Sequence, residues 1–153
     1  MPDLSLLRDY TIPYLHPLAV HFPLVLLPLA AGAALVFAVR GTDVWLRAAT
    51  ILLGLGAAAA LWARQTGEVL EEAVEGEPMA ALFLEAHERG ANATLAAAAL
   101  ALVLAALVWQ RARARGAVPL GLRVAVLAGA VLAALAVAYT GHLGGLMVWG
   151  VPR

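Results

Sequence analysis

Four long runs of apolar residues are the feature that most constrains what this chain can fold into. Residues 17–39 contain no charged side chain, and a helix needs about 20 mostly apolar residues to cross the hydrocarbon core of a bilayer. Comparable runs cover 44–63, 87–109 and 124–148. The 153-residue chain is 63% hydrophobic and 13% charged, which is more apolar surface than one soluble core of this size can bury. We therefore expect an all-α membrane protein with four spans.

The connections between the predicted spans indicate how the helices are arranged. The connection "RGTDVW" at 40–45 and the one around "RARARGAVP" at 111–119 are short, whereas the acidic segment 65–86 is longer. Short connections place consecutive helices antiparallel and side by side. The sequence therefore predicts a single domain over 1–153, an antiparallel up-down four-helix transmembrane bundle.

Arginine distribution predicts the orientation of the bundle. Six arginines fall on one side of the predicted spans with Asp43 as the only acid there; the other nine acidic residues fall on the opposite side. The six are Arg40, Arg47, Arg111, Arg113, Arg115 and Arg123. Because loops rich in arginine stay in the cytoplasm, we expect a multi-pass protein of the bacterial inner (cytoplasmic) membrane with both termini outside.

Composition removes several classes of function. The chain has no cysteine, which excludes iron–sulfur clusters, disulfides and c-type haem attachment. Its net charge is zero, and "RARAR" beside a span is a membrane anchor attracted to anionic lipid, so we expect no nucleic-acid partner. Ser5 is the only serine, and His87-Glu88 lacks the second histidine of a zinc-protease motif. The sequence therefore gives no support for a stand-alone hydrolase.

The histidines carry the strongest chemical signal. The chain has four, His16, His21, His87 and His142, and the predicted topology puts all of them at the outer ends of helices. His21 and His142 each lie 19 residues from the arginine at the inner end of their span, and His16 and His87 each lie 24 residues from theirs. At the helical rise these separations correspond to about 28 Å and about 36 Å. The histidines therefore form two level pairs, each drawn from two different helices.

Level imidazoles on separate helices predict a haem site. Two such imidazoles are how a b-type haem is held in a helix bundle, and small residues near His87 and His142 leave room for a flat ring. We expect His21 and His142 to be the axial ligands of haem b. His16 and His87 would ligate a second haem or metal, or bond the propionates of the first haem. His16 and His21 cannot point along one face, since five residues turn a helix by about 140°.

The expected function is electron transfer in the outer half of the membrane. A bis-histidine haem has no open coordination position, so an electron carrier or subunit fits better than an enzyme. Besides the lipid bilayer, the expected partners are a periplasmic electron carrier, which the acidic segment 65–86 would attract, or a larger respiratory complex.

Two alternatives stay open at the level of sequence. In the first, three or four of the histidines hold a copper, iron or zinc ion without haem, because imidazole is a good ligand for all three metals. In the second, the chain is a structural or assembly subunit without a cofactor, and its histidines serve packing and interfacial hydrogen bonds.

Two motifs resemble those of a known family. At "LHPLAVHFPLVLLP" and "TGHLGGLMVWGVP" the chain is similar to a bacterial family of short membrane proteins known as predicted membrane protein, domain of unknown function 2231. Its pattern is HPxxVHFP opening the first helix, Thr-Gly near the end of the second, a histidine beginning the third and a GxxGG stretch closing the fourth. These appear here at 16–23, Thr66-Gly67, His87 and 141–149, with Trp149 where the family often has tyrosine. The resemblance implies four spans and no particular activity.

Overall fold

The computed structural model describes residues 13–74 and 76–150, and all regular structure in this part of the chain is helical. Its helices are α2 (His16–Ala19), α3 (His21–Arg40), α4 (Asp43–Glu71), α5 (Pro78–Arg115) and α6 (Leu120–Trp149). Arg8, Glu75 and Arg153, which the sequence assigns to the outer side, lie outside the described residues.

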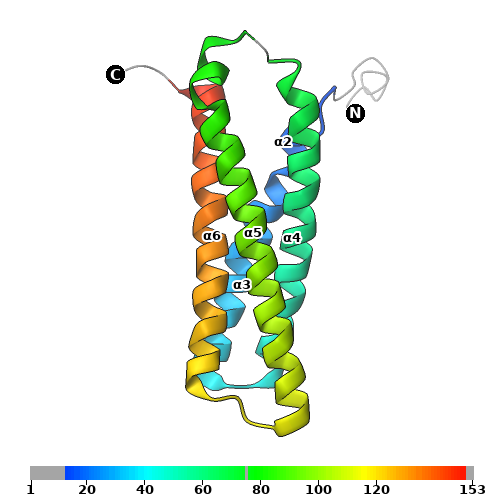
Figure 1. Ribbon diagram of the computed structural model, residues 1–153, viewed down its shortest axis with the longest axis vertical. Coiled ribbons are helices and arrows are strands. Elements are labelled where there is room, and N and C mark those ends of the chain that lie inside the picture. The colour runs from blue at the N-terminus through cyan, green and yellow to red at the C-terminus, as the bar shows by residue number, and fades with distance from the viewer. Residues whose placement is uncertain (1–12, 75, 151–153) are drawn as a thin grey trace, which may run out of the picture.

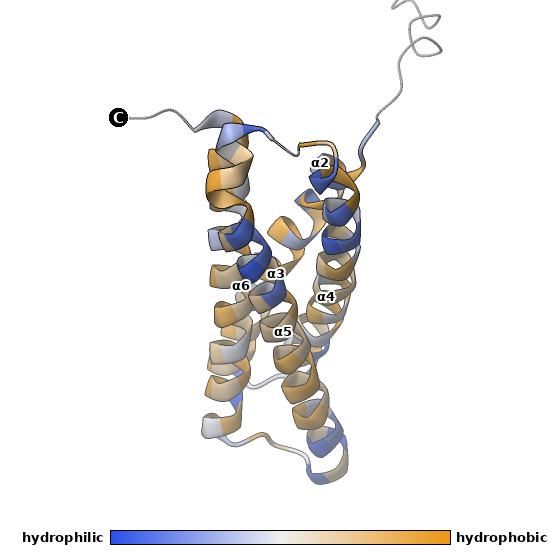
Figure 2. Cartoon of the chain, turned by 45° about the horizontal axis from the view of Figure 1, so that its top comes forward, coloured by the Kyte–Doolittle hydropathy of each residue, from blue (hydrophilic) through white to orange (hydrophobic). Residues whose placement is uncertain are grey.

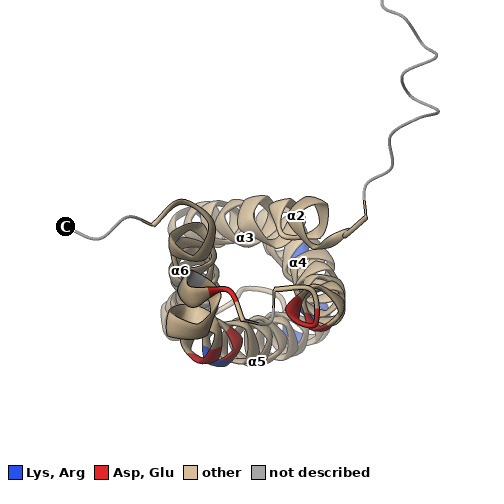
Figure 3. Ribbon diagram, turned by 90° about the horizontal axis from the view of Figure 1, so that it is seen from above, with Lys and Arg blue, Asp and Glu red and all other residues tan. Residues whose placement is uncertain are grey.

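The four long helices form a closed antiparallel ring (Figure 1). Helix α3 packs against α4 and α6, and α5 packs against the same two helices. Seen along the bundle axis, α3 and α5 face each other across the ring, as do α4 and α6 (Figure 3). The start of α2, the end of α6 and the α4–α5 connection share one end of the molecule (Figure 1). The predicted up-down four-helix bundle is confirmed.

Four helices are long and apolar enough to cross a membrane: His16–Arg40, Asp43–Glu71, Ala80–Arg115 and Leu120–Trp149. Each contains the corresponding predicted span and extends past it. Hydrophobic residues occupy the middle of the helices, and hydrophilic residues gather toward the two ends (Figure 2). We call these the acidic end, which carries the α4–α5 connection, and the arginine-rich end, which carries the other two connections.

The acidic segment 65–86, expected from the sequence to be the longer connection, is largely helical. Helix α4 continues to Glu71 and α5 begins at Pro78, so only residues 72–77 connect them. Glutamate and leucine favour the extra helical turns of α4, and an Arg64–Glu68 ion pair of 2.8 Å one turn apart supports them. Pro78 fits the first turn of α5, where its missing N–H costs nothing.

A short interruption at Val20 separates α2 from α3 within the first span. Pro23 has no N–H to donate to the carbonyl of Ala19, while Val20 still donates to His16 (3.1 Å) and Leu24 to Val20 (3.3 Å). The chain therefore stays close to helical through the interruption. His16 belongs to the short segment before it and His21 to the long helix after it.

The core of the bundle is built mainly from alanine, with a few large side chains between the helices. Leu27, Phe37, Leu46, Leu53 and Val126 are the largest fully buried residues. Many other large aliphatic side chains point away from the core; Leu100, for example, is 72% exposed. Because a bilayer solvates such side chains as well as a protein core does, this exterior is suited to lipid.

Gly56 on α4 supplies a test of the packing. A β-carbon at Gly56 would lie 2.5 Å from Cδ2 of the buried Leu27, so Gly56→Ala should destabilise the bundle by about 1–3 kcal/mol through overpacking. At Gly32 a β-carbon meets no atom of the described residues within 4 Å. Gly32→Ala should therefore leave stability unchanged or raise it by up to about 1 kcal/mol through helix propensity. Thermal unfolding in detergent measures both, and equal effects would contradict the α3–α4 packing.

Candidate functional site

Two of the four histidines meet inside the bundle near the acidic end. His16 begins α2, and His87 lies in the third turn of α5. Their ring centres are 6.2 Å apart, and the ring planes are nearly perpendicular at 82°. Both side chains are half-buried. This pair was predicted to be level from the residue count, and the structure confirms it.

A backbone carbonyl fixes the tautomer of His16. Its Nδ1 lies 2.9 Å from the carbonyl oxygen of Ala63 on α4. Since a carbonyl oxygen only accepts hydrogen bonds, Nδ1 carries the hydrogen and donates it. In the neutral ring Nε2 then carries a free lone pair, which is the form that binds metals.

His87 repeats this arrangement on the other side of the bundle. Its Nδ1 donates to the carbonyl oxygen of Thr140 on α6 at 3.0 Å. The same argument leaves Nε2 of His87 as the acceptor nitrogen. Each inward histidine therefore keeps one nitrogen for the protein and one for a ligand, as metal-binding histidines commonly do.

Two glycines make room for the two rings. Each histidine bonds a carbonyl four residues before a glycine: Ala63 precedes Gly67, and Thr140 precedes Gly144. A β-carbon at Gly67 would lie 3.1 Å from Cε1 of His16, and one at Gly144 would lie 3.1 Å from Cε1 of His87. Neither glycine has an unusual backbone conformation, since the positive-φ glycines are Gly41, Gly76 and Gly116. Their function here is to let an imidazole approach the helix.

Both histidines line a cavity of about 60 Å³. Val20, Leu24 and Val137 contribute apolar wall, and the Thr94 and Thr140 hydroxyl oxygens meet there at 3.1 Å. One water molecule needs roughly 10–15 Å³ of such space. The cavity therefore has room for an ion with a few waters, but it is far below the roughly 300 Å³ of the smallest cofactor pockets.

Arg64 is the one charged residue that lines this cavity within the described chain. Its Nε donates to Oδ1 of Asn92 on α5 at 2.9 Å, and its Nη1 pairs with Glu68 at 2.8 Å. These two partners fix the position of the guanidinium, and Glu68 offsets its charge.

His21 and His142 are not part of this site. Both are exposed, and neither lines the cavity. Nδ1 of His21 donates to the Pro17 carbonyl oxygen in the preceding turn at 2.6 Å. On α6 the buried residues nearest to His142 are Thr140 and Leu143, and His142 lies about 200° round the helix from Thr140 and about 100° from Leu143. The expectation that His16 and His21 face different directions is confirmed.

The structure also bears on the expected number of metal-ligating histidines. Over residues 13–74 and 76–150, no group of three or more histidine, aspartate or glutamate side chains is arranged to hold one ion. All four histidines belong to this part of the chain. The structure brings His16 and His87 together, whereas His21 and His142 are exposed; a site of three or four histidines stays a prediction from the sequence.

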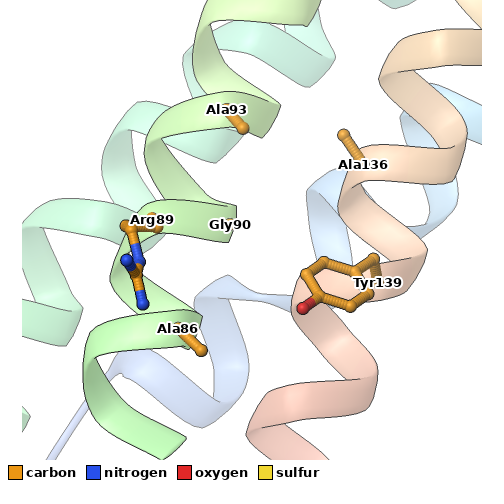
Figure 4. Close-up of a pocket in the computed structure, with 6 residues that line it drawn as sticks. All are labelled: Ala86, Arg89, Gly90, Ala93, Ala136 and Tyr139. Atoms are coloured by element: carbon orange, nitrogen blue, oxygen red, sulfur yellow. The ribbon is translucent and has the colours of Figure 1, made fainter.

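A groove of about 380 Å³ lies between α5 and α6, next to the histidine pair. Ala86, Gly90 and Ala93 on α5 and Ala136 on α6 line it, with the Tyr139 ring on one side and Arg89 at the edge (Figure 4). Arg89 and Tyr139 are exposed, so the groove opens to the exterior of the bundle. Ala86 and Gly90 lie on the same helix as His87 and close to it in sequence.

The chain belongs to the family described as predicted membrane protein (DUF2231), which it matches over residues 12–151. The comparison with curated proteins found no match, and the comparison with solved structures found none. Motif positions of the family resemblance meet at the site: His16 packs on Gly67 beside Thr66, and His87 packs on Gly144.

The carbonyl-bonded tautomers and the role of Gly144 can be tested together. ¹⁵N spectra of the histidine-labelled protein are recorded at about pH 8, above the ordinary pKa of histidine. They should show that His16 and His87 each carry a proton on Nδ1. Gly144→Val should shift the His87 signals, because the new side chain occupies the space of its ring. Gly145→Val is the matched control, since a β-carbon there meets no atom of the described residues within 4 Å. Protonation of either ring at Nε2 alone would contradict the assigned bonds.

Proposed function

We propose that this member of the DUF2231 family binds one transition-metal ion between His16 and His87 and uses it to carry single electrons. The observation that carries the proposal is the pair of imidazoles, 6.2 Å apart at their ring centres, each with Nδ1 bonded to a carbonyl and Nε2 left for a ligand. Both rings line the same small cavity.

The separation of the rings suits an ion with two nitrogen ligands on opposite sides. Metal–imidazole bonds are about 2.0 Å long, which sets the ring centres of two opposed imidazoles roughly 6 Å apart. The observed separation of 6.2 Å matches this value. A tetrahedral site would need further ligands; among the described residues the Thr94 and Thr140 hydroxyl oxygens lie at the cavity, and Thr66 Oγ1 lies 3.4 Å from Nδ1 of His16.

The charge of the site favours copper in its monovalent state. Two neutral imidazoles add no negative charge, and no carboxylate of the described residues lines the cavity. Transfer of an ion from water into an apolar site has a free-energy cost that rises with the square of its charge, so a monovalent ion is roughly four times less costly than a divalent one. Imidazole is a good copper ligand. The reduced ion, Cu⁺, is therefore the favoured state.

A bis-histidine b-type haem, the function expected from the sequence, is the second candidate. The same 6.2 Å separation favours it, since axial imidazoles also bind on opposite sides of one iron. The cavity volume of about 60 Å³ argues against haem binding here, because a haem between these rings would have to push the helices apart. A haem held by His21 and His142 would have to lie outside the bundle, where both are exposed.

The surroundings of the site support partners on two sides. The groove between α5 and α6 gives a small molecule dissolved in the membrane, such as a quinol, a place beside His87. The acidic end carries Glu68, Glu71, Glu72 and Glu77 (Figure 3), and such a surface attracts a basic electron-carrier protein. The arginine bias supports the bacterial inner membrane with the arginine-rich end in the cytoplasm and both termini outside.

Spectroscopy and metal analysis of detergent-purified protein test the proposal. Protein loaded with Cu⁺, washed and analysed should retain about one copper per chain and show no Soret band. A Soret band, together with a sharp α-band after reduction by dithionite, would show that the bound cofactor is haem and not copper. Retention of neither would overturn the electron-transfer function and leave the structural-subunit alternative.

Histidine variants identify the ligands. His16→Ala and His87→Ala should each weaken copper binding by more than about 100-fold, since even residues that merely orient a ligand cost 10–100-fold in metal affinity. His21→Ala and His142→Ala are matched controls and should bind copper as the parent does, because both side chains are exposed and outside the cavity. If His21→Ala and His142→Ala lost copper binding while His16→Ala and His87→Ala kept it, the assignment of His16 and His87 as ligands would be wrong.

A further inference from the structure

The arginine-rich end carries uncompensated positive charge. Its six arginines, Arg40, Arg47, Arg111, Arg113, Arg115 and Arg123, share that end with a single acid, Asp43. The ion pairs within 13–74 and 76–150 are Arg64–Glu68 and Arg89–Glu85, both toward the acidic end. None of the six arginines therefore has an ion-pair partner in the described chain.

Two of these arginines are also incompletely hydrogen-bonded. The Nε atoms of Arg111 and Arg123 are buried and lack a hydrogen-bond partner among the described residues. A buried N–H without an acceptor is unfavourable, and a charged one especially so. The other buried side-chain nitrogens and oxygens of the described residues all have partners. Because Arg111 and Arg123 are half-buried as whole residues, an acceptor from outside the chain would reach their guanidinium groups, and a rotation of the side chain would bring Nε to it.

The fold brings these two arginines to the same level on neighbouring helices. Arg111 lies near the end of α5 and Arg123 in the first turn of α6, and residues 116–119 connect the two antiparallel helices. The Arg123 guanidinium also lies over Gly41 after α3, where a β-carbon would be 2.6 Å from Nη1. Gly41 has a φ of 67° and thus both ends α3 and leaves space for this guanidinium.

We propose that Arg111 and Arg123 hold the phosphate of one anionic phospholipid at the arginine-rich end of the bundle. A guanidinium offers two parallel N–H donors to a phosphate, and Nε is one of them. Trp109, with the Arg47 guanidinium 5.8 Å from its ring centre, marks the level of the headgroups, where tryptophan is enriched.

Neighbouring apolar side chains favour a lipid over a soluble phosphate. Leu107 is 57% exposed and Leu120 is 61% exposed, on the same two helices as the arginines. Acyl chains would cover these side chains while the headgroup phosphate reaches the guanidinium groups. Arg113 and Arg115, by contrast, are exposed in the last turn of α5 and contribute only diffuse attraction to an anionic surface.

Native mass spectrometry with matched double variants tests the site. The intact chain in detergent is titrated with phosphatidylglycerol, with phosphatidylcholine and with inorganic phosphate. The parent should retain one phosphatidylglycerol in preference to phosphatidylcholine. Arg111→Gln/Arg123→Gln should weaken that binding at least about tenfold more than Arg113→Gln/Arg115→Gln, although both double variants remove the same charge.

A lysine variant separates loss of the site from loss of the fold. Arg111→Lys/Arg123→Lys keeps both charges but removes both Nε donors, and it should bind phosphatidylglycerol more weakly than the parent while unfolding at the same temperature. Equal weakening in the two glutamine variants, no preference for the anionic lipid, or displacement of the lipid by equimolar inorganic phosphate would each overturn the proposal.

Discussion

Two hydrogen bonds between imidazole and backbone carbonyl, His16 to Ala63 and His87 to Thr140, organise the polar interior of this bundle. Inside a bilayer a polar group without a partner is costly, so each histidine has to find one within the protein. A carbonyl already used by its own helix can accept a second hydrogen bond only where a donor reaches it from the side. Gly67 and Gly144 open that side, because each leaves its helix without the side chain that would block the ring.

The site has the same construction in both halves of the chain. In each half a histidine near the start of one long hydrophobic segment bonds a carbonyl near the end of the next, four residues before a glycine. The sequence shows no repeat that would predict this matching arrangement of the two halves. The two halves pack together through α3 with α6 and α4 with α5, and this packing brings one imidazole from each half to a shared cavity. A ligand there would join the halves.

Hydrophobicity and residue counting predict much of this architecture, including the four spans, the up-down bundle and the level pair of His16 and His87. They do not predict which histidines turn inward. The helices α3 and α6 are apolar all round, so the sequence contains little information about their rotation. The sequence analysis therefore preferred His21 and His142 as axial ligands, although both are exposed. A better signal was Gly67 and Gly144, each placed to receive a ring from another helix. The family motif contains both, but their partners become apparent only when the helices are packed.

The meeting of His16 with His87 is the central claim, and a ring-to-ring correlation tests it most directly. Solid-state NMR of histidine-labelled protein in lipid resolves contacts over this range, and four histidines give a simple spectrum. Cross-peaks are expected between the His16 and His87 rings, whose centres are 6.2 Å apart, and they should be lost in His87→Ala. Cross-peaks joining His21 to His142, with none between His16 and His87, would contradict it.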